Sequence, residues 1–273
     1  GAAEVLLLEP LQPQAPGDDG VACWEALVRP GRRLRSGTVL RSPRVASLRV
    51  EVGADLGEGR RAVRLDTGGL DLLEALERAG EVPLPPYVRA ALDDPERYQT
   101  VYADVPGSVA APTAGLHLSS AVLAGLAARG VQVAPVELAV GLGTFRPIAA
   151  PEVERHRMHA ERYRVPPSTW AKVQRAPRVV AVGTTVVRAL ESAAATGELE
   201  GRTELFIRGD FEFRVVERLL TNFHLPRSSL LVLIDAFIGP RWRTLYELAL
   251  AEGYRFLSFG DAMLLTRRGR GGR

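Results

Sequence analysis

The sequence predicts an α/β large domain preceded by a small all-β module with a barrel-like arrangement. Two observations support this fold class. Short apolar runs, broken by Gly, Pro and Asp, continue to about residue 68, and helical patterns alternate with extended ones after it. The chain has 273 residues, which at roughly 100 to 200 residues per domain suits one large and one small domain. We therefore assign residues 1–68 to the β module and residues 69–273 to the α/β domain.

The β module is expected to contain four strands. Apolar runs at residues 5–8, 23–28, 45–52 and 62–65 are the candidates, and turn-rich segments at 13–20 and 53–59 separate them. The first run begins almost at residue 1, with no capping segment before it. We expect the module to be incomplete at its N-terminus.

The second part of the chain shows helical periodicity first. Leu70, Leu73 and Leu76 form an apolar stripe that ends at Gly80. Further helices are predicted at residues 113–129, 185–195, 229–237 and 243–252. Strands are predicted at residues 131–140, 153–165, 179–182, 203–207, 212–216 and 254–259. This alternation is typical of an α/β domain.

Composition excludes several classes of protein. The single cysteine, Cys23, excludes an internal disulfide, and no Cys/His cluster has the spacing of a zinc site. The apolar run at residues 230–234 stops at Asp235, and that at 6–8 is too short for a signal peptide. We therefore expect a cytoplasmic protein. The net charge is only +3, so the basic tail at 267–273 is compatible either with a polyanionic partner or with a solvated end.

Five segments place polar residues at the ends of apolar runs, where α/β domains have their clefts. They are residues 112–117, 141–145, 183–188, 221–226 and 259–263. In one of them, Gly183, Thr184 and Thr185 join an apolar strand to a helix, whose N-terminus favours an anion. Arg188 lies one turn further along and is able to pair with a carboxylate or phosphate. The alternative is a packed turn in which Arg188 pairs with Glu161 or Glu191.

The other segments also have two interpretations. Thr113 is either a plain helix cap or, with Gly115, part of a site where the backbone approaches a ligand. His117, among apolar positions, is either a core residue or a catalytic one. The trio at 222–224 combines an amide, an aromatic ring and a titratable base, which suits a heterocycle. Asp261 is able either to accept from a guanine-like edge or to cap the next turn.

Several motifs together resemble a known family. They include Gly-Glu-Val-Pro-Leu-Pro-Pro-Tyr at 80–87, Tyr-Gln-Thr-Val-Tyr-Ala at 98–103, and the stretch from 107 to 117. The resemblance continues through residues 141–145, 158–161, 183–192, 221–226 and 254–263. The sequence is similar to the S-adenosylmethionine:tRNA ribosyltransferase-isomerases of queuosine biosynthesis, over nearly the whole chain. Family members have several tens of residues before the β module, so the chain is expected to lack the family's N-terminal segment.

The resemblance implies transfer and isomerisation of the ribosyl moiety of S-adenosylmethionine onto 7-aminomethyl-7-deazaguanine at the tRNA wobble position. The products are epoxyqueuosine-tRNA, adenine and methionine. This chemistry needs a base beside the sulfonium and an acid for the departing adenine. It implies no metal and no cofactor, because S-adenosylmethionine is a consumed co-substrate. The partners are the precursor tRNA and S-adenosylmethionine, with no membrane, and we expect a monomer.

The resemblance also selects the site residues. Histidine is the side chain best suited to proton transfer near neutral pH, and three of the four histidines fall inside the matching motifs. The predicted catalytic residues are His117, His159 and His224, with their individual roles open. The predicted residues for substrate binding are Thr113, Gly115, Gly143, Thr144, Phe145, Glu161, Gly183, Thr184, Thr185, Arg188, Asn222, Phe223 and Asp261.

Three departures from the family pattern lie within the matching region. Ala139 stands where the family usually has histidine, Arg208-Gly209-Asp210 replaces a Pro-Gly-Tyr turn, and Glu217 replaces aspartate. The alternative to an active enzyme is therefore a catalytically impaired relative that binds tRNA. A methyltransferase is disfavoured, because no Gly-rich dinucleotide-type turn opens the chain.

Overall fold

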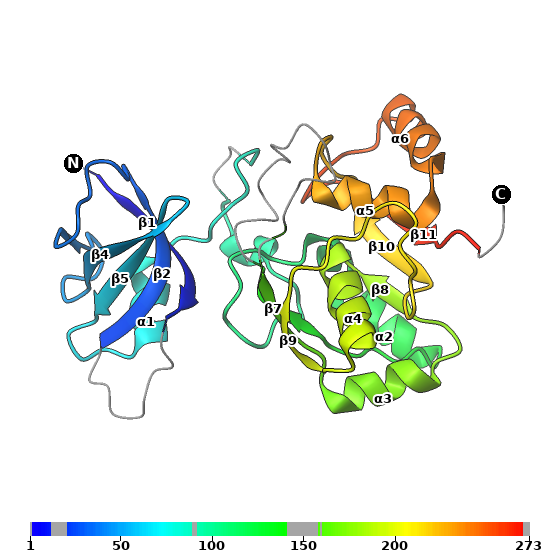
Figure 1. Ribbon diagram of the computed structural model, residues 1–273, viewed down its shortest axis with the longest axis horizontal. Helices are drawn as coiled ribbons and strands as arrows, with labels where there is room; N and C mark the ends of the chain where they lie inside the picture. Colours follow the sequence, from blue (N-terminus) through cyan, green and yellow to red (C-terminus); the bar gives the residue numbers. More distant parts are fainter. Residues whose placement is uncertain (1, 12–20, 89–91, 141–157, 159, 270–273) are drawn as a thin grey trace. The chain divides into compact units, whose positions relative to one another are not determined.

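The computed structural model describes residues 2–11, 21–88, 92–140, 158 and 160–269. These residues belong to two compact units, Gly1–Val88 and Arg89–Arg273 (Figure 1). The sequence predicted the change of architecture at residue 68. The first unit extends further because a helix that follows the strands packs on their sheet.

The first unit contains one five-stranded sheet of antiparallel neighbours, ordered β1-β2-β5-β4-β3. Its core is formed by alternate residues such as Ala26, Val52 and Val63, whose side chains are buried. Because β1 and β3 lie at opposite ends of this order, the described strands form an open sheet and not the predicted barrel. The strands are β1 Glu4–Pro10, β2 Val21–Arg29, β3 Val39–Arg41, β4 Arg49–Gly57 and β5 Arg60–Asp66.

Helix α1, Leu72–Ala79, completes the first unit. The Asp71 side chain caps it by accepting from the backbone N–H of Glu74. Its apolar stripe places Leu72 against Ala22 and Leu65 of the sheet. The helix ends at Gly80, as the sequence predicted.

The second unit contains two three-stranded sheets, ordered β11-β10-β8 and β6-β7-β9. In the first sheet β10 is parallel to β8 and antiparallel to β11, whereas the pairs in the second sheet are antiparallel. The strands are β6 Glu137–Leu138, β7 Glu161–Arg164, β8 Val180–Val182, β9 Glu200–Thr203, β10 Arg218–Asn222 and β11 Ala262–Thr266.

Helix α4, Thr184–Thr196, contacts strands of both sheets and forms the centre of this unit (Figure 1). Its Val187, with Ile234 and Phe237 of helix α5, lies in the largest apolar core. The remaining elements are α2 Ser120–Ala128, α3 Pro167–Arg175, α5 Ser229–Ile238, α6 Arg241–Ala251 and the 3₁₀ helices η1 Pro95–Tyr98 and η2 Thr113–His117. The architecture is therefore one of mixed helix and sheet. Within the described residues, the search for a helix able to span a bilayer gives no candidate.

Several predicted elements of this unit differ in the structure. The helix expected at residues 113–129 is divided into η2 and α2, because Ser119 caps a new helix by accepting from Val122 N. Of the strand expected at 131–140, only the two residues of β6 form a strand. The strand expected at 203–207 is replaced by β9, which begins and ends a few residues earlier in the sequence. Strand β10 and helix α3 were not predicted.

Two other predicted strands are replaced by loops for identifiable reasons. The strand expected at 212–216 does not form, because the carboxylate of Glu191 accepts the backbone N–H groups of residues 214–216 at 2.8, 3.0 and 2.9 Å. The strand expected at 254–259 does not form either. There the Asp261 side chain accepts from Arg255 N at 2.7 Å and closes a loop, and β11 begins after it.

Candidate active site

Three of the predicted segments lie at one edge of the first sheet in the second unit. Because β8 and β10 are parallel, with Val182 opposite Leu220, their C-terminal ends reach the same edge. The antiparallel β11 brings its N-terminal end there, since Ala262 pairs with Asn222. The residues that follow or precede these ends are Gly183–Thr185, Phe223–His224 and Asp261.

The 3₁₀ helix η2 adds a fourth segment to this edge. The Thr113 hydroxyl donates to Asn222 Oδ1 at 3.0 Å, and Asn222 Nδ2 lies 3.3 Å from His117 Nε2. On the other side, a Cβ placed on Gly183 would lie 4.0 Å from the Cβ of Ala114. η2 therefore contacts the ends of both parallel strands.

This hydrogen-bond chain determines how the imidazole of His117 is presented. The Asn222 side chain is buried, and its carbonyl oxygen accepts a hydrogen bond from the Thr113 hydroxyl. The amide nitrogen of Asn222 therefore faces His117. An amide nitrogen only donates, and His117 Nε2 must therefore accept. In the neutral ring the proton is then on Nδ1. Since His117 is exposed, it presents an N–H donor to its surroundings.

His224 has a different environment. Its Nε2 lies 2.9 Å from Thr221 Oγ1, and its backbone N–H donates to the Tyr246 hydroxyl at 3.0 Å. Burial lowers the pKa of His224 to about 4, so its ring is neutral near pH 7. Burial likewise raises the pKa of Tyr246 to about 12. His224 is thus held as a neutral, hydrogen-bonded group, whereas His159 lies outside the described residues.

The sequence predicted that Phe223 binds the substrate, whereas the structure places this ring in the core. Phe223 is 4% exposed and packs between aromatic neighbours, with ring centroids 5.3 Å from Tyr246 and 4.8 Å from Phe256. Gly115, expected to let a ligand approach, serves packing instead: a Cβ there would lie 2.0 Å from the Tyr102 hydroxyl. Asp261 lies at the same edge of the sheet, where its carboxylate closes the preceding loop by accepting from Arg255 N at 2.7 Å.

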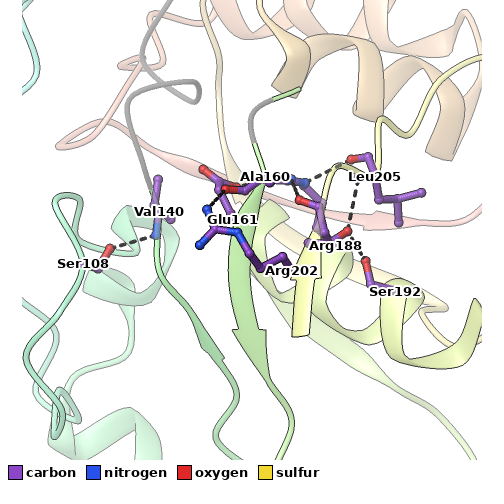
Figure 2. A network of polar contacts seen from close by, with 9 residues as sticks. Ser108, Val140, Ala160, Glu161, Arg188, Ser192, Arg202 and Leu205 are labelled. Carbon is purple, nitrogen blue, oxygen red and sulfur yellow. Dashed lines mark hydrogen bonds and ion pairs between the residues drawn. The ribbon is translucent and has the colours of Figure 1, made fainter. Parts of the chain in front are cut away.

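Arg188 of α4 and Glu161, the first residue of β7, form a buried ion pair (Figure 2). Their side chains are 6% and 2% exposed. The Arg188 Nε also donates to the carbonyl oxygen of Leu205 at 3.2 Å. This is the second of the interpretations considered for the sequence, in which Arg188 pairs within the protein. The pair and the bond to Leu205 fix the position of the guanidinium.

A pocket opens where the first turns of α4 and α5 meet. Thr184, Thr185 and Arg188 line it from α4, and Ser229 lines it from α5. Its remaining walls are mostly apolar and are formed by Met158, Leu205, Phe206, Ile207, Leu230 and Leu233. Ser229 was not selected from the sequence, where a serine at the start of a helix indicates only a cap.

Some of the predicted site residues lie outside the part of the chain that the structure describes. Gly143, Thr144 and Phe145 belong to the undescribed segment 141–157. Among the residues with described positions, no group of three or more His, Cys, Asp or Glu side chains is arranged to hold a metal ion.

The departures from the family pattern have ordinary structural contacts. Ala139 N donates to the Arg162 carbonyl oxygen at 2.8 Å and so extends the pairing of β6 with β7. The carboxylate of Asp210, in the altered turn, lies 2.7 Å from Nη2 of Arg268. Glu217 uses its backbone carbonyl to accept from Arg267 N at 3.0 Å.

Comparison with known proteins gives a consistent result. The model of the family described as "Queuosine biosynthesis protein" matches residues 1–265. The S-adenosylmethionine:tRNA ribosyltransferase-isomerase of Rubrobacter xylanophilus is 53% identical over 93% of this chain and 74% of its own length. The protein of that name from Anaeromyxobacter dehalogenans is 51% identical over 98% of this chain and 78% of its own. The S-adenosylmethionine tRNA ribosyltransferase from Thermotoga maritima, whose crystal structure is known, is 33% identical in sequence to this chain, and the two structures superpose with a TM-score of 0.47. The match covers 97% of this chain and 75% of the Thermotoga chain. The chain belongs to the family of queuosine biosynthesis proteins.

Proposed function

We infer that this chain is an S-adenosylmethionine:tRNA ribosyltransferase-isomerase. Relatives that carry this name are 46–53% identical to it over more than nine-tenths of its length. In the proposed reaction the ribosyl moiety of S-adenosylmethionine is transferred to 7-aminomethyl-7-deazaguanine at the tRNA wobble position and isomerised. Adenine and methionine are released, so S-adenosylmethionine is a consumed co-substrate and no further cofactor takes part.

The observation that best supports a catalytic site at this sheet edge is the pair of hydrogen bonds that joins Thr113, Asn222 and His117. It holds an exposed imidazole in one orientation at the place where two parallel strands end. In this tautomer His117 Nδ1 is a hydrogen-bond donor, which suits a ring nitrogen of the departing adenine as negative charge develops on it. We propose that role for His117.

His224 is proposed to have a positioning role. A group with a pKa of about 4 is almost entirely unprotonated near pH 7 and is a poor acid there. Its contacts with Thr221 and Tyr246 fix the loop that follows β10. For the base that removes the proton beside the sulfonium we propose His159, which the sequence analysis predicted to be catalytic.

The tRNA is proposed to bind through its phosphates. Arg241 and Arg243 are exposed on helix α6, and the guanidinium of Arg243 lies 4.8 Å from the Trp242 ring centroid. Phosphate contacts supply most of the affinity of such complexes, whereas the modified base is read in a pocket. We propose a monomer that acts in the cytoplasm, where its tRNA substrate is found.

The experiment is incubation of the chain with S-adenosylmethionine and tRNA that carries the precursor base. We expect release of adenine and methionine in equal amounts, and a strong decrease in rate for His117→Gln. His156→Gln is the matched control, because His156 lies outside the motifs shared with the family. Tight tRNA binding without adenine release would instead favour the impaired, tRNA-binding relative.

A further inference from the structure

The loop between helix α6 and strand β11, residues 254–261, exposes two aromatic rings (Figure 1 shows the two elements). Tyr254 is 50% exposed and Phe259 is 41% exposed. Single exposed apolar residues are common on protein surfaces, but these two rings share one short loop that leads to the proposed site.

Each of the two rings is held in place by a buried ring. Phe259 contacts the buried Tyr98, with ring centroids 5.6 Å apart and planes inclined by 59°. Tyr254 contacts the buried Phe223, with centroids 5.9 Å apart and planes inclined by 71°. Neither pair is stacked face to face, so these contacts fix the exposed rings without covering a whole face.

The backbone of the loop is also fixed. The Asp261 carboxylate accepts from Arg255 N, and Leu257 N donates to the Phe223 carbonyl oxygen at 3.0 Å. Leu257 has a φ of 74°, a conformation that a non-glycine residue adopts only where its surroundings enforce it. At Gly260 a Cβ would lie 2.4 Å from the Arg255 carbonyl oxygen, so this tight closure requires glycine. The exposed rings therefore project from a rigid loop.

Two sets of contacts place Phe259 close to the sheet edge at which His117 lies. The loop leads into Ala262, which pairs with Asn222, and the Asn222 amide is bonded to His117. Phe259 precedes Ala262 by three residues, which span at most about 11 Å. In addition, Tyr98 belongs to η1, which contacts the helix η2 that carries His117.

The chemistry of the loop suits a single-stranded nucleic acid. Arg255 is exposed and is the only charged residue among residues 254–259. The loop follows helix α6, whose Arg241 and Arg243 are proposed above to contact tRNA phosphates. Exposed aromatic rings bind unpaired bases by stacking, and a neighbouring arginine adds a backbone contact. The bases beside a wobble base lie in the anticodon loop and are unpaired, so they are suitable partners.

We propose that loop 254–261 binds the anticodon loop of the tRNA, with the Phe259 ring stacked on a base next to the wobble base. Tyr254 supplies a second stacking ring, and Arg255 supplies a phosphate contact. This inference rests on the proposed function. It assigns base stacking to an exposed ring in place of the buried Phe223.

The test measures binding of an anticodon stem-loop RNA that carries the precursor base, by fluorescence anisotropy without S-adenosylmethionine. Phe259→Leu keeps an apolar side chain but removes the ring, and it should weaken binding about tenfold, as loss of one base–aromatic stack predicts. Phe259→Tyr keeps the ring and should bind like the wild-type chain. Val180→Ala is the control: Val180 is 48% exposed but begins β8, at the opposite end of the parallel strands.

Two abasic RNAs, each lacking one of the bases that flank the wobble base, identify the contact. With one of them, Phe259→Leu and the wild-type chain should bind equally, because the stacking partner is then absent for both. A difference that persists with both abasic RNAs would come from an altered fold and overturns the inference. If Phe259→Leu weakens binding of S-adenosylmethionine and leaves RNA binding unchanged, the ring contacts adenine instead, which also overturns it.

The remaining outcomes are equally decisive. RNA binding that does not depend on the Phe259 ring, or a wild-type chain that does not bind the RNA, overturns the inference. If thermal unfolding shows that Phe259→Leu fails to fold, Tyr254→Leu and Tyr254→Phe make the same comparison. Adenine release with tRNA tests the proposed function separately. Ring-dependent RNA binding without adenine release would refute the proposed reaction and leave the loop assignment standing.

Discussion

Replacing Glu161 with glutamine tests the buried ion pair that joins β7 to α4. Both side chains are buried, so Arg188 in the variant would be a buried cation without its counter-charge. Removing one partner of such a pair typically costs about 3–5 kcal/mol. Arg188 keeps its bond to the carbonyl oxygen of Leu205, which favours the lower part of this range. We expect Glu161→Gln to reduce the free energy of unfolding of the second unit by about 3 kcal/mol.

Urea unfolding followed by tryptophan fluorescence measures this loss. The chain has three tryptophans, of which Trp24 lies in the first unit and Trp170 and Trp242 lie in the second. A Trp24→Phe background therefore makes the signal specific for the second unit. With a slope of roughly 2 kcal/mol per molar urea, the midpoint should fall by about 1.5 M.

The double variant Glu161→Leu with Arg188→Met supplies the control. It removes both charges together, and it should be more stable than Glu161→Gln because no buried charge is left unpaired. A loss below about 1 kcal/mol for Glu161→Gln would refute the account, because that is the size typical of an exposed ion pair.

Three further predictions concern the histidines and the tRNA. The folded-state pKa of His224, about 4, lies below the ordinary value of 6.5, so the unfolded chain takes up the proton first. Stability should therefore fall by roughly 2–3 kcal/mol between about pH 6.5 and 4, and this part of the loss should vanish in His224→Gln. In Asn222→Asp the carboxylate only accepts, so two-bond ¹H–¹⁵N spectra should show the His117 proton moved from Nδ1 to Nε2; an unchanged pattern would contradict the hydrogen-bond chain. The double variant Arg241→Ala with Arg243→Ala should weaken tRNA binding, and the slope of log K against log salt concentration should become smaller in magnitude by about 1–2. An unchanged slope would show that α6 does not contact the tRNA phosphates.

The sequence identified the segments that meet at the edge of β8 and β10 better than the fold around them. The turn at Gly183 was recognisable because an apolar run stops there and a helix begins. That Asn222 and His117 meet could not be derived from spacing, since 105 residues separate them. The resemblance to a family assigned both residues to one predicted site, and the structure shows the hydrogen bond between their side chains.

The remaining errors arise from tertiary contacts that leave no local signal. Phe223 is in an aromatic core because three rings from later parts of the chain surround it. The segment 212–216 has the alternation of a strand, but its N–H groups are used by Glu191. Ser229 was overlooked because its place in the pocket depends on the neighbouring helix.

The most direct test of the central claim is mass spectrometry of nucleosides from the tRNA after reaction. If this chain is a ribosyltransferase-isomerase, the precursor base at the wobble position should be converted to epoxyqueuosine, with one adenine released per modified base. A methylated nucleoside, or an unchanged tRNA with no free adenine, would contradict the assigned activity.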